Sequence, residues 1–94
     1  MTAANEEDCR QLVRASGSVG ANYREANDAL GKKDFLMRIR ISRKEAKESA
    51  YWLKLISETN MLENHAESEH LFREATELVK ILSSIAQGFS ARPQ

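Results

Sequence analysis

Features of β-sheet, disulfide-rich and membrane-spanning proteins are scarce in this 94-residue sequence. It has no alternating run of Val, Ile or Thr and no Asn-Gly or Asp-Gly hairpin turn, so strands are not expected. Its one cysteine, Cys9, cannot form an internal disulfide, and no apolar run approaches the roughly 18 residues of a membrane span. The acidic start MTAANEEDC lacks the apolar core of a signal peptide. We therefore expect one all-α domain, residues 1–94, located in the cytoplasm.

An excess of charge of one sign is also missing, because 14 Lys and Arg residues balance 14 Asp and Glu residues. The charges are nevertheless distributed unevenly along the chain. Residues 31–54 carry eight basic and three acidic side chains, and the segments on either side are both acidic. The middle third is therefore a basic band between acidic flanks.

Helical periodicity is present throughout. It predicts three helices, over residues 6–29, 32–59 and 65–87, with glycines Gly31 and Gly88 at helix ends. Short links make consecutive helices antiparallel neighbours, so the expected architecture is an up-and-down helical bundle.

Each predicted helix has an apolar seam that is expected to form the core. The middle helix has the clearest seam, with alternating steps of four and three residues. Its members are Phe35, Ile39, Ser42, Ala46, Ser49, Leu53 and Ile56. The seam of the first helix consists of Cys9, Leu12, Val13, Ser16, Val19, Gly20 and Tyr23. The seam of the third consists of Leu71, Ala75, Leu78, Leu82, Ile85 and Phe89.

Small residues one turn apart in the first helix predict a close helix contact. The pairs are Ser16 with Gly20 and Gly17 with Ala21. Each glycine costs about 1 kcal/mol relative to alanine inside a helix. We expect close packing of another helix at these glycines to compensate for that cost.

A second apolar stripe follows one flank of the middle helix and has no predicted cover. It consists of Met37, Ile41, Trp52 and Leu55. Burying side chains of this size stabilises a protein by roughly 1.5–3 kcal/mol each. We therefore expect the chain to self-associate, with this flank as the oligomer interface.

The basic band forms one face of the middle helix. A turn of about 100° per residue places its cations opposite the seam. The candidate nucleic-acid contacts are Lys33, Arg40, Arg43, Lys44 and Lys47. Cations on one face repel each other, whereas a polyanion relieves the repulsion through counterion release. The alternative is a solvated face that Glu45 and Glu48 balance.

No catalytic residue, metal site or cofactor is predicted. The histidines His65 and His70 are five residues apart, about 140° around a helix, and so do not face a common metal ion. No serine has a base at helical contact distance. Gly17 and Gly20 have the spacing of a glycine loop that binds nucleic acid, but the module with that loop needs strands, and this chain has no strand signals. The segment also lacks the Gly-Lys-Ser/Thr ending of a phosphate loop. An enzymatic function is therefore not expected.

A distributed pattern over residues 6–89 resembles one known family. The residues that carry the resemblance are Leu12, Arg14-Ala15, Ser18-Val19, Ala21-Asn22, Glu25, Gly31-Lys-Lys-Asp-Phe35-Leu36, Ser42, Ala46 and Glu48. In this pattern the chain is similar to the four-helix-bundle proteins encoded in intervening sequences of bacterial 23S rRNA genes. It is also similar to accessory proteins of diversity-generating retroelements.

The resemblance implies an up-and-down four-helix bundle that assembles into a ring, usually a pentamer, and has basic surfaces suited to nucleic acid. Family members carry an additional N-terminal helix before the segment that matches residues 6–26. The resemblance therefore implies that three of the four helices are evident here. Either the start is truncated, or a partner subunit fills the fourth position.

Two functions of different classes remain open. The first is non-enzymatic binding of structured RNA, or DNA, through phosphate contacts of the basic face. The second is an oligomeric scaffold whose basic face docks an acidic protein. Salt dependence and competition with bulk RNA distinguish the two. No membrane or small-molecule partner is expected.

Overall fold

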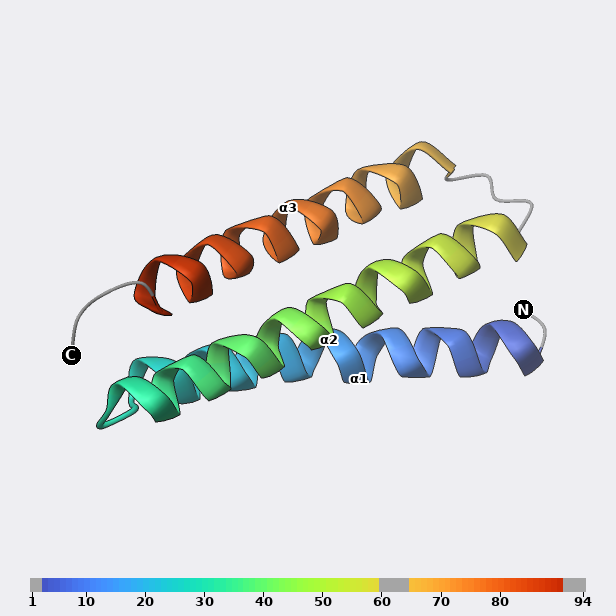
Figure 1. Ribbon diagram of the computed structural model, residues 1–94. Coiled ribbons are helices and arrows are strands. Elements are labelled where there is room, and N and C mark those ends of the chain that lie inside the picture. Colours follow the sequence, from blue (N-terminus) through green and yellow to red (C-terminus); the bar gives the residue numbers. More distant parts are fainter. Residues whose placement is uncertain (1–2, 60–64, 91–94) are drawn as a thin grey trace.

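The computed structural model describes residues 3–59 and 65–90, and all regular structure in these ranges is helical. Helix α1 spans Ala3–Asn27, α2 spans Lys32–Thr59 and α3 spans His65–Ser90. Consecutive helices run in opposite directions, and α2 lies between the other two (Figure 1). The all-α bundle expected from the sequence is confirmed.

The observed bounds of α2 agree with the predicted ones, whereas α1 and α3 end or begin at other residues than predicted. The α1 helix begins three residues earlier than predicted and ends at residue 27. The Gly31 carbonyl accepts a hydrogen bond from the Phe35 N–H at 3.0 Å, which makes Gly31 the residue that opens α2. Gly88, in contrast, does not end the third helix, because α3 continues to residue 90.

An apolar core joins α2 to α3. Ile39 and Leu82 are almost completely buried. The rings of Phe35 and Phe89 lie 4.4 Å apart at their centroids and are tilted by 36°. Such aromatic pairs stabilise a contact beyond the area they bury. The predicted seams of α2 and α3 therefore meet around Ile39, Leu82 and the Phe35–Phe89 pair, whereas Leu71 (45% exposed) and Leu78 (37% exposed) of the predicted α3 seam are not buried.

The interface between α1 and α2 is built from small side chains and hydrogen bonds. Ala15 and Ala26 of α1 are buried, as are Ser42 and Ala46 of α2. The Ser42 hydroxyl donates to the backbone carbonyl of Val19 at 2.8 Å. A side chain as short as serine can reach a backbone carbonyl of the neighbouring helix only when the two helices lie close together.

The predicted seam of α1 is wrong in its rotation. Of its seven residues only Val19 is buried, while Val13 is 71% exposed and Tyr23 is 44% exposed. The face of α1 that contacts α2 is centred on Ala15 and Ala26. At 100° per residue, this face lies about 80° around the helix from the centre of the predicted seam. The prediction placed large apolar side chains in the contact between helices, whereas alanine side chains form it.

The close contact predicted at Gly17 and Gly20 is also not found within the described chain. A Cβ atom at either position would have no neighbouring atom within 4 Å. The small residues that bring the two helices together are the buried alanines and serines instead. Both glycines face open space.

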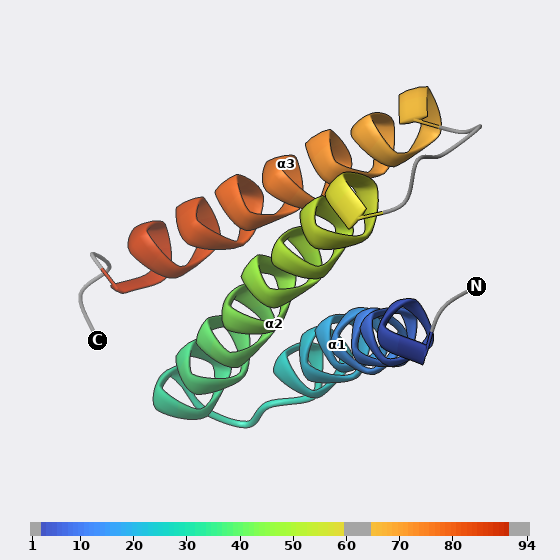
Figure 2. The ribbon, with the colours of Figure 1, turned by 90° about the vertical axis from the view of Figure 1, so that its right-hand side faces the viewer.

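The backbones of α1 and α3 are not direct neighbours. Both pack on α2, but no Cα of α1 lies within 8 Å of a Cα of α3 among the described residues. The view in Figure 2 shows α2 between two separated ribbons. The molecule is elongated, with extents of 51 × 20 × 13 Å. None of the three helices, over the described residues, has both the length and the apolar content that crossing a membrane requires.

We predict that Ala46→Leu lowers stability more than Lys44→Leu. Ala46 is 1% exposed within the apolar core, so extra methylenes would overpack that core at a cost of about 1–3 kcal/mol. Lys44 is exposed, and its replacement should change the unfolding free energy by no more than about 0.5 kcal/mol. Thermal and urea melts followed by circular dichroism measure both. The opposite ranking would show that the rotation of α2 described above is wrong.

Candidate nucleic-acid interface

The predicted cations lie on the side of α2 that faces away from the core. Lys33, Arg40, Lys44 and Lys47 are exposed, and Arg43 is half-buried. The helical period that buries Ile39 turns these positions outward. The structure therefore brings all five together as one surface, which we call the basic face.

Part of the basic face borders α3, which the sequence did not predict. A shallow hollow of about 350 Å³ is lined by Arg40, Arg43, Ser83, Ala86 and Gln87. Ser83 and Gln87 add hydrogen-bonding groups beside two guanidinium groups. Their spacing of four residues puts them on one side of α3, but only the pairing of α3 with α2 shows that this side adjoins the cations.

Two acids of the basic stretch, Glu45 and Glu48, are paired with α1. Arg14 of α1 contacts the Glu45 carboxylate at 3.1 Å and the Glu48 carboxylate at 2.8 Å. Its hydrogen bond to Glu48, opposed by partial desolvation and aided by Glu45, raises the pKa of Arg14 above its ordinary value. Arg14 is charged at every working pH with or without this shift. Both carboxylates therefore pair with Arg14 of α1 and form no ion pair with the cations of the basic face.

The cations themselves have few acidic partners. Lys33, Lys44 and Lys47 form no ion pair with any described residue. Asp34 lies near Lys33 on the rim of the same surface. The alternative of a face balanced by Glu45 and Glu48 does not fit this geometry.

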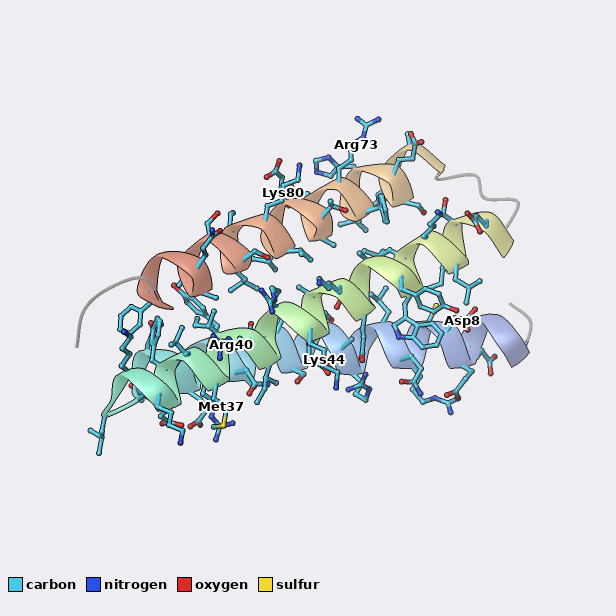
Figure 3. All side chains as sticks on the ribbon, viewed as in Figure 1. Asp8, Met37, Arg40, Lys44, Arg73 and Lys80 are labelled. Carbon is cyan, nitrogen blue, oxygen red and sulfur yellow. The ribbon has the colours of Figure 1, made fainter. Side chains whose placement is uncertain are left out.

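An apolar hollow interrupts the basic face near the start of α2. It measures about 790 Å³ and is lined by Gly31, Lys33, Asp34, Met37, Arg40, Ile41 and Lys44. Met37 is 45% exposed and projects from α2 away from α3 (Figure 3). The hollow therefore combines an apolar floor with a mostly cationic rim.

The flank predicted as an oligomer interface is only partly open. Ile41, Trp52 and Leu55 are half-buried within the chain, which leaves Met37 as its exposed member. Trp52 also contacts the neighbouring Tyr51 edge to face, with ring centroids 5.0 Å apart. The flank therefore needs less cover from a partner than the sequence indicated. Val13 of α1 (71% exposed) and Ile81 of α3 (53% exposed) are more exposed than Met37.

The described residues contain no group of three or more His, Cys, Asp or Glu side chains placed to hold a metal ion. His70 contacts Glu74 at 3.3 Å on the exposed side of α3, and the side chain of His65 lies outside the described residues. Fold and surface together define an all-α helical-bundle protein with one basic helix face.

Comparison with known proteins identifies the family. A model of the 23S rRNA-intervening sequence proteins matches residues 4–84, so the chain belongs to this family. It is also similar to a crystal structure of a protein of unknown function from the S23 ribosomal protein family of Bacteroides thetaiotaomicron VPI-5482. The identity is 37% and the TM-score 0.78, over 84% of this chain and 72% of the other. No curated protein matches the chain.

We predict that the cations of the basic face do not stabilise the fold. Replacing Lys44 and Lys47 together by glutamine should change the unfolding free energy by less than about 0.5 kcal/mol, because neither contributes to the core. Arg14→Gln is the matched comparison, and it should lower the melting temperature because Glu45 is buried and would lose its cation. A clear loss of stability in the double lysine variant would indicate a structural role for those cations.

Proposed function

We propose that this protein is a non-enzymatic, cytoplasmic nucleic-acid-binding module that contacts the phosphates of structured RNA through its basic face. The observation that carries the proposal is the one-sided placement of Lys33, Lys44 and Lys47 without ion-pair partners among the described residues. Unpaired cations on one helix face gain energy when a polyanion releases its counterions on binding.

The form of the surface supports phosphate contacts in preference to base readout. A single straight helix face with lysines meets a phosphate backbone without entering a groove. Aromatic side chains that could stack on unpaired bases are scarce, and Tyr51, which is 58% exposed, is the one near the cations. Structured RNA of many sequences should therefore bind with similar affinity.

The hollow where the basic face meets α3 is a further feature that supports phosphate binding. Arg40 and Arg43 lie beside Ser83 and Gln87 in one hollow. Guanidinium groups bind phosphate with two parallel hydrogen bonds, and hydroxyl and amide groups supply further donors. A phosphate at this hollow would contact two helices at once, which fixes its position better than isolated lysines do.

Self-association is a further part of the proposal. Its support is the exposed Met37 beside the half-buried Ile41, on a flank next to the basic face. Repeating the basic face around a ring, for which the family suggests five copies, would multiply weak contacts through effective concentration.

A second candidate function is a scaffold that docks an acidic protein. The specific observation in its favour is the apolar floor of Met37 and Ile41 between Lys33, Arg40 and Lys44. An acidic amphipathic helix could place apolar side chains in this hollow and carboxylates against its rim. Duplex RNA offers no apolar group for that floor, so the two candidates differ in whether Met37 contributes to binding.

We predict weak binding of structured RNA that falls steeply between low and physiological salt. The triple variant Lys33→Glu, Lys44→Glu and Lys47→Glu should abolish it, since these exposed side chains supply the charge. Fluorescence anisotropy with a labelled RNA hairpin measures the affinity, and circular dichroism checks the helicity. Met37→Ala should leave RNA binding unchanged at a protein concentration where light scattering gives it the same mass as the wild type.

The matched control reverses three cations elsewhere, by Arg10→Glu, Arg73→Glu and Lys80→Glu. Arg73 and Lys80 project from the far side of α3 (Figure 3), and all three side chains are at least 70% exposed. The net charge change is the same, so RNA binding should persist at a reduced level. Equal loss in both triple variants, or no binding by the wild type at low salt, refutes the nucleic-acid proposal. Binding to acidic peptides but not to RNA would favour the scaffold.

We predict that the purified chain is larger than a monomer at tens of micromolar, and that Met37→Glu shifts it toward the monomer. A carboxylate on the apolar flank would have to be desolvated in the interface, which costs several kcal/mol. Multi-angle light scattering after gel filtration measures the mass. A wild-type monomer would disprove self-association, and an oligomer unaffected by Met37→Glu would place the interface elsewhere.

A further inference from the structure

The hollow where the basic face meets α3 contains a guanidinium group that the protein itself does not pair. Arg43 is half-buried, and it forms no hydrogen bond or ion pair with any described residue. A guanidinium group that is partly removed from water without a partner lowers stability, and an anion at this position would offset that cost. Arg43 therefore differs from the lysines of the basic face, which are exposed to water.

The polar groups around this hollow can all donate hydrogen bonds. Its lining consists of Arg40, Arg43, Ser83, Ala86 and Gln87. A guanidinium group only donates, and a serine hydroxyl and a glutamine amide can donate as well. Among the described residues no carboxylate lines the hollow, and the sequence has no Asp or Glu after Glu77. The lining is therefore suited to an anion with several oxygen atoms.

The donors come from two helices whose packing is fixed by the core. Arg40 and Arg43 are three residues apart on α2, and Ser83 and Gln87 are four residues apart on α3, so each pair lies on one side of its helix. Ala86 is 4% exposed and belongs to the core between these helices. Because its side chain is short, a hollow remains beside it. An anion held there would contact α2 and α3 together.

Charge indicates which kind of phosphate suits the hollow. A phosphodiester within a strand carries one negative charge, whereas a phosphomonoester carries about −1.5 to −2 at pH 7 and has three acceptor oxygens. Arg40 and Arg43 together carry two positive charges, which a monoester neutralises and a single diester does not. Each guanidinium group can also bind two phosphate oxygens in parallel. A phosphate at the end of a strand therefore fits better than one inside it.

We propose that the hollow between α2 and α3 binds a phosphomonoester, the group that ends a 5′-phosphorylated RNA strand. This inference rests on the function proposed above, because the lysines of the basic face would contact the diesters of the same RNA. Arg40 and Arg43 would bind the terminal oxygens, and Ser83 and Gln87 would donate to them from α3. Affinity would then depend on the chemistry of the strand end as well as on the charge of the strand.

The test compares two RNA hairpins of one sequence, labelled in the loop, that end in a 5′-phosphate or a 5′-hydroxyl. At physiological salt we expect the 5′-phosphate hairpin to bind about tenfold more tightly by fluorescence anisotropy. Arg43→Gln should reduce this ratio of affinities to about one, and Ser83→Ala should reduce it by a smaller factor. Since Arg43 has no hydrogen bond or ion pair to lose, its replacement should keep the fold, which circular dichroism checks.

Two controls separate the strand end from total charge. A 5′-hydroxyl hairpin that is one base pair longer carries two more charges as diesters, and it should bind within about twofold of the shorter 5′-hydroxyl hairpin. Lys44→Gln removes one charge outside the hollow. This variant should weaken both original hairpins alike and leave their ratio unchanged.

The pH dependence of the ratio is a readout that a structural role of Arg43 would not change. A phosphomonoester loses its second proton with a pKa of about 6, so the ratio should rise between about pH 5 and about pH 7.5. The charged side chains that line the hollow are Arg40 and Arg43 of α2, which keep their protons in this range. From α3 it is lined by Ser83, Ala86 and Gln87, which do not titrate, and no described residue of α1 lines it.

The outcomes distinguish this inference from the function on which it rests. Equal affinity of the two original hairpins, or a preference that Arg43→Gln retains, refutes the phosphomonoester site and leaves RNA binding by the basic face intact. If neither hairpin binds at low salt, the proposed function fails, and calorimetric titration with adenosine 5′-monophosphate tests the hollow by itself. Binding of this nucleotide that Arg43→Gln abolishes, with no binding of adenosine, supports the site with a free nucleotide as its ligand. No binding of the nucleotide refutes the site as well.

Discussion

The polar contact between α1 and α2 determines how every other surface of this protein is arranged. Arg14 bridges Glu45 and Glu48, and Ser42 donates to the Val19 carbonyl one turn further along α1. The half-exposed pair with Glu48 contributes little energy, whereas Glu45 is buried and depends on Arg14 as its cation. Together these contacts fix the orientation of α1 on α2. They hold the alanine face of α1 against α2, which turns the larger apolar side chains of α1 away from that contact.

Two separate surfaces follow from this orientation. On one side of α2 the acids are engaged by α1, and the lysines remain as an uncompensated basic face. On the other side, Tyr23 lines an apolar hollow with Leu78 and Ile81 of α3, and Val13 of α1 is also exposed. The same rotation of α1 therefore produces both the charged surface and the apolar one.

Periodicity was sufficient to predict α2 and the basic face, because α2 alternates clearly between apolar and cationic sides. It was insufficient for α1, whose contact face is made of Ala15 and Ala26 and is chosen by partners on another helix. Arg14 is 31 residues from Glu45 and 34 from Glu48, and local sequence patterns contain no information about such pairs. The contribution of Ser83 and Gln87 was missed for the same reason, since it requires the register of α3 on α2.

All sides of α2 are in use, which limits where further molecules can bind. One side contacts α1, a second contacts α3, a third is the basic face, and the remaining strip around Ser42 is the floor of the apolar hollow. A polyanion on the lysines would approach from the opposite side. The two surfaces are therefore sterically independent, because α2 lies between them.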